Sequence, residues 1–217
     1  MKQTFLARRR VALGFVFGAF VVYFAAPQPM TIALGAAVAV IGQAVRIWAA
    51  GHLEKSREVT VSGPYRFMRH PLYVGSSIMA IGVVIACQSL VVAVLVALYM
   101  SLTISSAISS EEAFLRERFG NAYDDYAASR GPRVERRFSW ARAWRNKEYR
   151  AATGLVLFLL AMTVRMYVGR WHESGSGGIG AVSVGCAELA VNLLAVLVVA
   201  GLGWWLGGRK PGASGGK

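Results

Sequence analysis

Several long apolar runs separated by basic segments constrain the fold of this chain more than any other feature of its sequence. The runs fall at about 11–26, 30–50, 72–86, 90–109, 151–168 and 182–206. Several of them approach the roughly 20 residues that a helix needs to cross a hydrocarbon core. Only 16% of the 217 residues are charged, against roughly a quarter in soluble domains. Because backbone groups in lipid must be paired within their own segment, open sheets are excluded. The sequence therefore predicts an all-α, polytopic membrane helical bundle.

Positive charges lie between the apolar runs, and their distribution predicts the topology. The arginines at 8–10 place the amino terminus in the cytoplasm, because cytoplasmic loops carry the excess of Lys and Arg. Alternation of the six runs then places the basic segments 51–71, 111–150 and 207–217 inside as well. We expect about six transmembrane helices with both termini cytoplasmic, in a bacterial inner membrane. The net charge of +13 then indicates contact with anionic lipid headgroups and argues against nucleic acid.

The same pattern divides the chain into four parts. Residues 1–50 hold the first two spans, 51–150 a core with a helical hairpin, 151–206 two additional spans, and 207–217 a Gly-rich tail expected to be disordered. The first run lacks a convincing cleavage site, so we expect a retained anchor. Cys87 and Cys186 match no metal-ligand spacing, and no metal site is predicted. A single bridge between them is conceivable, but two small apolar side chains within helices are favoured.

One polar stretch, 63–75, lies where the chain re-enters the membrane before the third apolar run. Pro71 suits the first turn of a helix, where its missing N–H costs nothing. His70 and Tyr73 then lie at the helix start, where free N–H groups and the positive end of the helix dipole favour an anionic group. Gly75 allows close approach of another helix or of a ligand.

A second polar stretch begins with Glu111-Glu112 and follows the fourth run. Large side chains recur after it at steps of four, four and three, namely Leu115, Phe119, Tyr123 and Tyr126. This spacing predicts one face of an amphipathic helix that continues the run 90–109 and lies against the bundle or the headgroups. We interpret the two tyrosines as aromatic packing at the membrane interface and not as chemical groups.

Charged residues near the membrane boundary need partners or solvent. Adjacent carboxylates are costly there unless paired or liganded, and Arg66 and Arg69 are available partners on the same side. Arg46 is expected to extend to the headgroups, with a substrate-facing role as the alternative. His52 and His172 fall in loops and carry no functional signal. Topology determinants and interface anchors account for the remaining basic and indole side chains, namely Arg133, Arg136, Arg137, Arg142, Arg145, Trp48, Trp140, Trp144, Trp171, Trp204 and Trp205.

Together the two polar stretches carry a family resemblance. The Arg-His-Pro-x-Tyr-x-Gly motif at 69–75, the Glu-Glu pair at 111–112 and the Phe-Gly-x-x-Tyr-x-x-Tyr motif at 119–126 resemble the isoprenylcysteine carboxyl methyltransferase family of integral-membrane methyltransferases. Phospholipid N-methyltransferases share a similar pattern. The resemblance covers roughly 43–137, somewhat under half of the chain. In the eukaryotic enzymes the Glu-Glu stretch lies close to the carboxyl end, whereas two further apolar runs follow it here.

The resemblance implies a pocket for S-adenosylmethionine between the hairpin helices and the polar segments. By matching motif positions, the cofactor contacts are His70, Pro71, Tyr73, Gly75, Glu111 and Glu112. The candidate catalytic residues are Arg69, which would hold an acceptor carboxylate or phosphate, and Glu111, which would be a base for an amine acceptor, as would His70. Arg46 and Arg66 join Arg69 as candidate substrate-binding residues. Transfer to a carboxylate mainly requires alignment of the reacting atoms and exclusion of water.

The expected activity is S-adenosylmethionine-dependent methyl transfer to a membrane lipid or lipidated acceptor that enters from the bilayer on the cytoplasmic side. Carboxylate O-methylation is favoured over phospholipid N-methylation. An NADPH-dependent enzyme of the sterol-reductase type has a similar Arg-His-Pro motif, but the paired carboxylates suit a 2′-phosphate poorly. A non-catalytic lipid-binding membrane protein is the remaining alternative. A transporter is disfavoured because the sequence shows no inverted repeat or broken helix pair.

Overall fold

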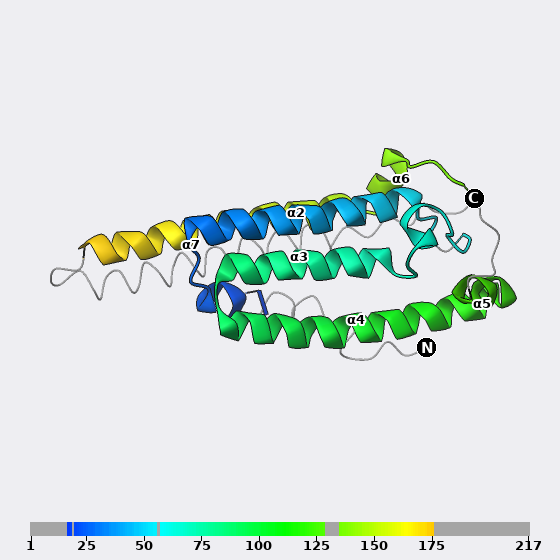
Figure 1. Cartoon of the computed structure of the whole chain (residues 1–217), viewed down its shortest axis with the longest axis horizontal. Coiled ribbons are helices and arrows are strands. Elements are labelled where there is room, and N and C mark those ends of the chain that lie inside the picture. The colour runs from blue at the N-terminus through cyan, green and yellow to red at the C-terminus, as the bar shows by residue number, and fades with distance from the viewer. Residues whose placement is uncertain (1–16, 19, 56, 129–134, 176–217) are drawn as a thin grey trace, which may run out of the picture.

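The computed structural model describes residues 17–18, 20–55, 57–128 and 135–175, and these ranges contain helices and no strand. Three of the described helices are long and apolar enough to cross a membrane: α2 (Pro29–His52), α4 (Leu90–Phe119) and α7 (Glu148–Gly175). A fourth apolar helix, α3 (Pro71–Cys87), is shorter. These helices form an elongated bundle, and the short elements gather at one end of it (Figure 1). The predicted all-α architecture is confirmed for the described residues, and three of the helices have the length and composition of membrane spans.

Four of the predicted spans coincide with described helices. The runs 30–50, 72–86, 90–109 and 151–168 correspond to α2, α3, α4 and α7, and the last two helices extend well beyond the predicted ends. Of the run 11–26, residues 17–18 and 20–24 are helical, whereas 182–206, with Cys186, lies outside the described residues. The count of six spans and the cytoplasmic placement of the termini therefore remain predictions.

Glycine residues bring α2 and α3 into close backbone contact. A Cβ atom added at Gly35 would lie 2.5 Å from the carbonyl oxygen of Gly82, and one added at Gly42 would lie 2.7 Å from that of Gly75. Small residues at such positions allow two membrane helices to pack backbone against backbone. Gly75 was predicted to permit close approach of a helix or a ligand, and in the structure a helix makes the contact.

A tight turn joins α3 to α4, as the sequence predicted. Gln88 adopts a left-handed conformation with φ of 47°, and the side chain of Ser89 accepts a hydrogen bond from the backbone N–H of Val92. The backbone N–H of Ala26 donates to the carbonyl of Cys87 at 2.8 Å, which ties the segment before α2 to this turn. Cys87 is buried as a free thiol against Met162 of α7.

The predicted single amphipathic helix after the fourth span is two helices. α4 ends at Phe119 because Gly120 adopts φ of 51°, and α5 (Asn121–Ala127) then leaves in a new direction (Figure 1). The predicted apolar face nevertheless holds on both sides of the break, since Tyr123 is fully buried while Arg116 and Asp124 are exposed. Gly120 of the Phe-Gly-x-x-Tyr-x-x-Tyr motif thus changes the direction of the chain without exposing the apolar face.

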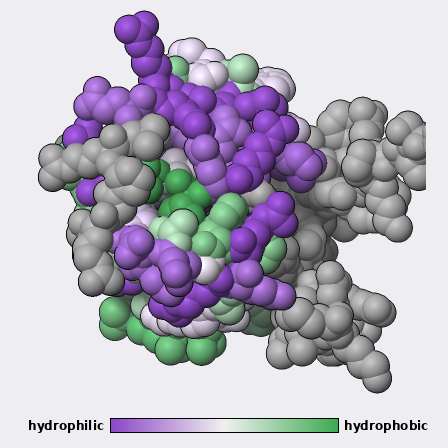
Figure 2. All heavy atoms as spheres, turned by 90° about the vertical axis from the view of Figure 1, so that its right-hand side faces the viewer, coloured by the Kyte–Doolittle hydropathy of each residue, from purple (hydrophilic) through white to green (hydrophobic). Residues whose placement is uncertain are grey.

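The remaining short elements lie at the same end of the bundle as α5. They are the 3-10 helix η1 (Gly63–Arg66), which precedes α3, and α6 (Trp140–Arg145), which precedes α7. Polar residues surround a recess with an apolar floor when the bundle is viewed from this end (Figure 2). This end of the bundle holds the polar stretches that the sequence singled out.

Candidate active site

A cavity of about 960 Å³ opens at this end of the bundle. Its walls come from α2, the loop 53–60, η1, the start of α3, α4 and α5. The volume is at the upper end of the range typical of small-molecule and cofactor sites. The two polar stretches that the sequence singled out, separated by a helical hairpin, therefore line one common pocket.

The start of α3 presents His70 to the pocket. His70 is the residue before the helix and Pro71 occupies its first turn, as predicted. The carbonyl of His70 accepts from the backbone N–H groups of Tyr73 and Val74, which fixes the backbone at this corner. The imidazole Nε2 lies 3.1 Å from Glu112 Oε1, and Nδ1 lies 4.0 Å from Glu111 Oε2. The ring therefore stands between the two carboxylates.

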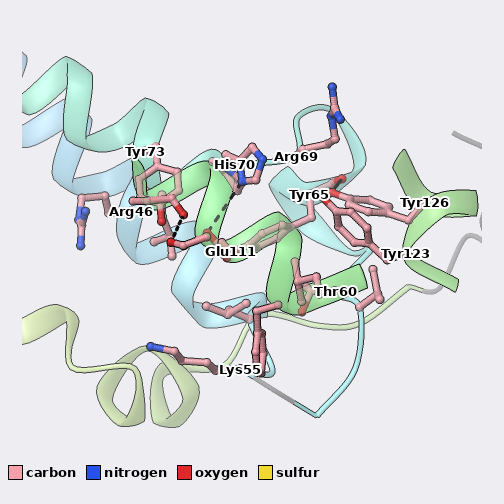
Figure 3. A pocket seen from close by; sticks show the side chains of 18 of the residues that line it. Arg46, Lys55, Thr60, Tyr65, Arg69, His70, Tyr73, Glu111, Tyr123 and Tyr126 are labelled. Carbon is pink, nitrogen blue, oxygen red and sulfur yellow. Dashed lines mark hydrogen bonds and ion pairs between the residues drawn. The ribbon is translucent and has the colours of Figure 1, made fainter. Parts of the chain in front are cut away.

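The two adjacent glutamates have different surroundings. Glu111 lines the pocket and accepts a hydrogen bond from the Tyr73 hydroxyl (Figure 3). Glu112 lies outside the lining and is held by His70, by Arg69 at 3.8 Å and by Arg116 at 3.6 Å. Glu111 thus faces the pocket directly, whereas Glu112 contacts the ring of His70 from outside the lining.

Tyrosines from η1 and α5 form an aromatic wall of the pocket. Tyr126 donates a hydrogen bond to the carbonyl of Tyr65 at 2.9 Å, which closes α5 onto η1 (Figure 3). Burial raises the pKa of Tyr126 to about 12 and raises the pKa of Tyr65 further still, so both phenols are neutral at physiological pH. The buried hydroxyl of Tyr123 has no hydrogen-bond partner among the described residues, although Tyr123 lines the pocket.

Arg46 does not extend to the headgroups as the sequence predicted. Its Nε and Nη2 atoms donate to the two carboxylate oxygens of Glu148, each at 3.0 Å, and Nη1 donates to Ser76. The pairing is largely shielded because α7 begins with the buried Glu148 and packs beside α2, so the partly buried guanidinium is held at the pocket wall. No motif or spacing in the sequence marks Glu148, which is one carboxylate in a long basic segment.

Two other predicted residues lie outside the pocket lining. Arg66 points to Glu135, with which it makes an exposed ion pair at 3.4 Å, and it makes no ion pair with Glu111 or Glu112 in the described structure. Gly75 packs against the stem of Arg46 in the interface between α2 and α3. Their predicted roles in binding remain predictions.

The loop after α2 forms one wall of the pocket, although the sequence indicated only a polar segment there. Leu53, Glu54, Lys55, Glu58 and Thr60 are among its pocket-lining residues. The hydroxyl of Thr60 accepts from the backbone N–H of Glu54 at 3.2 Å and closes the loop on itself. No spacing in the sequence marks these residues, because they are brought to the pocket by the end of α2 and not by a motif.

His52 was predicted to lie in a loop, and this placement is wrong. It is the last residue of α2, is buried, and its Nδ1 lies 2.9 Å from the carbonyl of Trp48. Gly63, with φ of 61°, packs on its ring, where a Cβ atom would lie 2.6 Å from the imidazole. This contact sets the position of η1 and of the motif that follows. His172 lies within α7, also contrary to the predicted loop.

Comparison with known proteins supports the same region as the functional core. The model of the phospholipid methyltransferase family matches residues 30–122. The nickel-cobalt-cadmium resistance protein NccN of Alcaligenes xylosoxydans xylosoxydans is 35% identical over 96 residues, which is 43% of each chain. The protein-S-isoprenylcysteine O-methyltransferase of Schizosaccharomyces pombe is 33% identical over 85 residues, covering 39% of this chain and 36% of that protein. A probable protein-S-isoprenylcysteine O-methyltransferase of Oryza sativa is 37% identical over 76 residues.

The apolar helices indicate an integral-membrane protein, and over residues 30–122 the chain is similar to membrane methyltransferases. Its resemblance to the isoprenylcysteine carboxyl methyltransferase and phospholipid methyltransferase families, predicted from the motifs, is confirmed over residues 30–122. The matches span well under half the length of the curated relatives. No solved structure matches the chain.

Proposed function

We propose that this protein transfers a methyl group from S-adenosylmethionine to a lipid-like or prenylated acceptor at the cytoplasmic face of the membrane, with O-methylation of a carboxylate favoured. One observation carries the proposal. A single cavity joins the start of α3, the carboxylate of Glu111 and a face of the membrane helix α4. Polar binding groups and a route from the bilayer are therefore available in the same site.

The residues present suit S-adenosylmethionine. The molecule carries a sulfonium cation, ribose hydroxyls and a zwitterionic amino-acid end, which carboxylates, aromatic rings and a helix start can each bind. Glu111, His70, Pro71 and Tyr73 would hold it, and all four line the cavity. The unpartnered hydroxyl of Tyr123 offers a further hydrogen bond to a bound molecule, since a buried polar group without a partner is costly. When bound, the cofactor supplies an electrophilic methyl group.

The acceptor side of the proposal depends on α4. Its pocket-lining residues recur at helical spacing from Tyr99 to Glu111. Among them, the small side chains of Ser106 and Ala107 occupy little space in the cavity. This distance corresponds to about 18 Å along a helix that rises about 1.5 Å per residue. Leu102 and Thr103 lie on the same face, within the apolar part of the helix. An acceptor with an apolar tail can therefore lie along α4 with its polar end near Arg69.

Catalysis in this arrangement is a matter of position and charge. Arg69 lines the cavity and would orient an acceptor carboxylate, which needs no base in order to attack a methyl group. The neutral phenols of Tyr65 and Tyr126 exclude water from one wall without competing as nucleophiles. His70, held by Glu112, fixes the corner at which the two polar stretches meet.

N-methylation of a phospholipid amine is the second candidate, and it is favoured by the family model that matches residues 30–122. An amine acceptor would have to lose a proton, and Glu111 is the pocket carboxylate available to take it. The two candidates thus differ in the expected effect of Glu111→Gln. The substitution would abolish transfer to an amine and would reduce transfer to a carboxylate only through weaker cofactor binding.

The proposal is tested by calorimetric binding of S-adenosylmethionine, with NADPH in parallel, to the purified protein in detergent. Binding of S-adenosylmethionine alone, weakened in His70→Ala and preserved in the exposed control Glu117→Gln, is the expected result. Binding of NADPH alone would favour the sterol-reductase type of enzyme. Binding of neither molecule would favour a non-catalytic lipid-binding role.

A second assay follows transfer of a labelled methyl group to a prenylated cysteine carboxylate and, separately, to a phospholipid amine. Label on the prenylated cysteine identifies O-methylation, and label on the amine identifies N-methylation. Protein that binds S-adenosylmethionine but labels neither probe would exclude both acceptor classes while leaving the cofactor pocket intact.

A further inference from the structure

The segment 135–146 lies outside the part of the chain that matches the methyltransferase family, yet it is bound to the wall of the pocket. Its arginines were interpreted from the sequence as topology determinants. In the structure several of its side chains contact the last turn of α2 and the loop that follows it. These contacts join parts of the chain that are more than 80 positions apart.

Hydrogen bonds from this segment satisfy the carboxyl end of α2. The backbone N–H of Ser139 and the Nε of Arg142 both donate to the carbonyl of Gly51, at 3.1 and 2.8 Å. Asn146 Nδ2 donates to the carbonyls of Ala50 and Leu53, at 2.8 and 3.0 Å. The last carbonyls of a helix have no partner within the helix, so these side chains complete it.

Ion pairs from the same segment hold the loop itself. Three arginine side chains surround the carboxylate of Glu54, which is only 18% exposed and lines the pocket: Arg136 at 3.8 Å, Arg142 at 3.6 Å and Arg145 at 3.7 Å. Arg136 also pairs with Glu58, a second pocket-lining carboxylate. A cluster of several charges around a partly buried group orders a loop more than an isolated surface pair does.

An aromatic ring packs tightly where segment 135–146 meets the end of α2. A Cβ atom added at Gly51 would lie 2.1 Å from the ring of Phe138, so the two segments are in direct contact there. The Phe138 ring also lies 6.0 Å from that of His52, on which Gly63 of η1 packs. Movement of the segment would therefore be transmitted to the loop 53–60 and to η1, which leads into the motif at 69–75.

We propose that segment 135–146 is a positioning clamp for the pocket: through Arg142 and Asn146 it fixes the end of α2 and the carboxylate-bearing loop 53–60 in the arrangement that binds the cofactor. The inference rests on the proposed methyltransferase function of this pocket. Arg142 and Asn146 do not line the pocket and are positioning residues, since they act through the carbonyls of α2 and through Glu54.

The test compares Arg142→Ala and Asn146→Ala with Arg137→Ala. Arg137 is an exposed arginine of the same segment whose side chain forms no ion pair or hydrogen bond among the described residues, so it controls for loss of charge. We expect the dissociation constant for S-adenosylmethionine to rise about tenfold in the first two variants and to stay within about twofold in the control. Arg142→Lys, which keeps the charge and one donor, is expected to recover most of the affinity.

Hydrogen exchange supplies the readout that does not depend on a ligand. Peptides covering 50–62 are expected to lose protection in Arg142→Ala and Asn146→Ala, while peptides from the middle of α3 keep theirs. Unchanged exchange and unchanged affinity in both variants overturn the clamp, as does an equal loss in the Arg137→Ala control. If the wild-type protein binds no S-adenosylmethionine, the proposed function fails, and the exchange experiment still decides whether the segment holds the loop.

Discussion

Nε2 of His70 lies 3.1 Å from a carboxylate oxygen of Glu112, so the residue before α3 and the C-terminal part of α4 are joined across 42 positions of sequence. Both groups are largely buried, and Arg69 and Arg116 complete the surroundings of the carboxylate. Glu112 supports His70 from outside the pocket lining, and its predicted contact with a cofactor remains a prediction. Substitution of either residue should therefore disturb the same corner.

We expect His70→Ala and Glu112→Gln each to weaken S-adenosylmethionine binding by about tenfold. The double variant should bind no more weakly than the more severe single variant, because the effects of substitutions in residues that act as one unit do not add. Calorimetric titration of the four proteins measures the cycle. Additive losses would show that Glu112 contacts the ligand independently of His70.

The glycine contact between α2 and α3 leads to a prediction about stability. A Cβ atom at Gly82 would lie 2.5 Å from the carbonyl oxygen of Gly35 and 2.6 Å from the backbone nitrogen of Ala39. Because backbone cannot yield as a side chain can, Gly82→Ala should lower the free energy of unfolding by about 1–3 kcal/mol. Thermal unfolding in detergent measures this change.

Gly154→Ala is the matched control for that experiment. Gly154 lies within α7, and a Cβ atom there meets nothing within 4 Å. Alanine in an open helical position is expected to raise stability by about 0.5–1 kcal/mol, because glycine loses more backbone freedom on folding. Similar shifts for the two variants would mean that the close approach of α2 and α3 does not limit the bundle.

The pair Arg46–Glu148 ties α7 to the wall of the pocket. Glu148→Gln removes the charge that balances a mostly buried guanidinium, and loss of one partner of such a pair typically costs about 3–5 kcal/mol. Arg46 retains 21% exposure, so we expect a loss at or below the lower end of this range. The midpoint of thermal unfolding reports it, and a double variant, Arg46→Met with Glu148→Met, should regain most of the loss.

A surface pair provides the comparison. Glu135 pairs with Arg66 at 3.4 Å, but its side chain is 84% exposed. Glu135→Gln should change stability by less than about 1 kcal/mol, because exposed pairs are screened by solvent. Equal effects of Glu135→Gln and Glu148→Gln would contradict the buried character of the Arg46 pair.

Two neighbouring tyrosines of α5 should respond differently to loss of their hydroxyl groups. Tyr126→Phe removes the hydrogen bond to the carbonyl of Tyr65 and should cost about 1 kcal/mol of stability. Tyr123→Phe removes a buried hydroxyl without a partner in the described structure, so stability should be unchanged or slightly raised. Thermal unfolding without ligand separates the two.

The same variants distinguish packing from binding. If the Tyr123 hydroxyl bonds a bound molecule, Tyr123→Phe should weaken S-adenosylmethionine or acceptor binding by several-fold despite its intact stability. Titration of the two variants with S-adenosylmethionine, and with a prenylated cysteine carboxylate, measures this effect. Unaltered affinity for both probes would support the original interpretation of Tyr123 as a packing residue.

The sequence by itself determined the class of architecture and much of the candidate site. Apolar run lengths predicted the helices that became α2, α3, α4 and α7, because the bilayer imposes a length on any segment that crosses it. The resemblance carried by the motif at 69–75 and the Glu-Glu pair at 111–112 also implied a pocket between them, and both stretches line one cavity in the structure.

Only the tertiary structure decided what those residues contact. The break at Gly120 divides the predicted helix, because a single left-handed residue redirects a chain whose face pattern continues unchanged. Arg46 turned inward because Glu148, which is 102 positions away, meets it at the start of α7. The wall at 53–60 and its arginine contacts likewise depend on the packing of distant segments. Such pairings have no period or spacing in the sequence, because they are set by where whole helices come to rest.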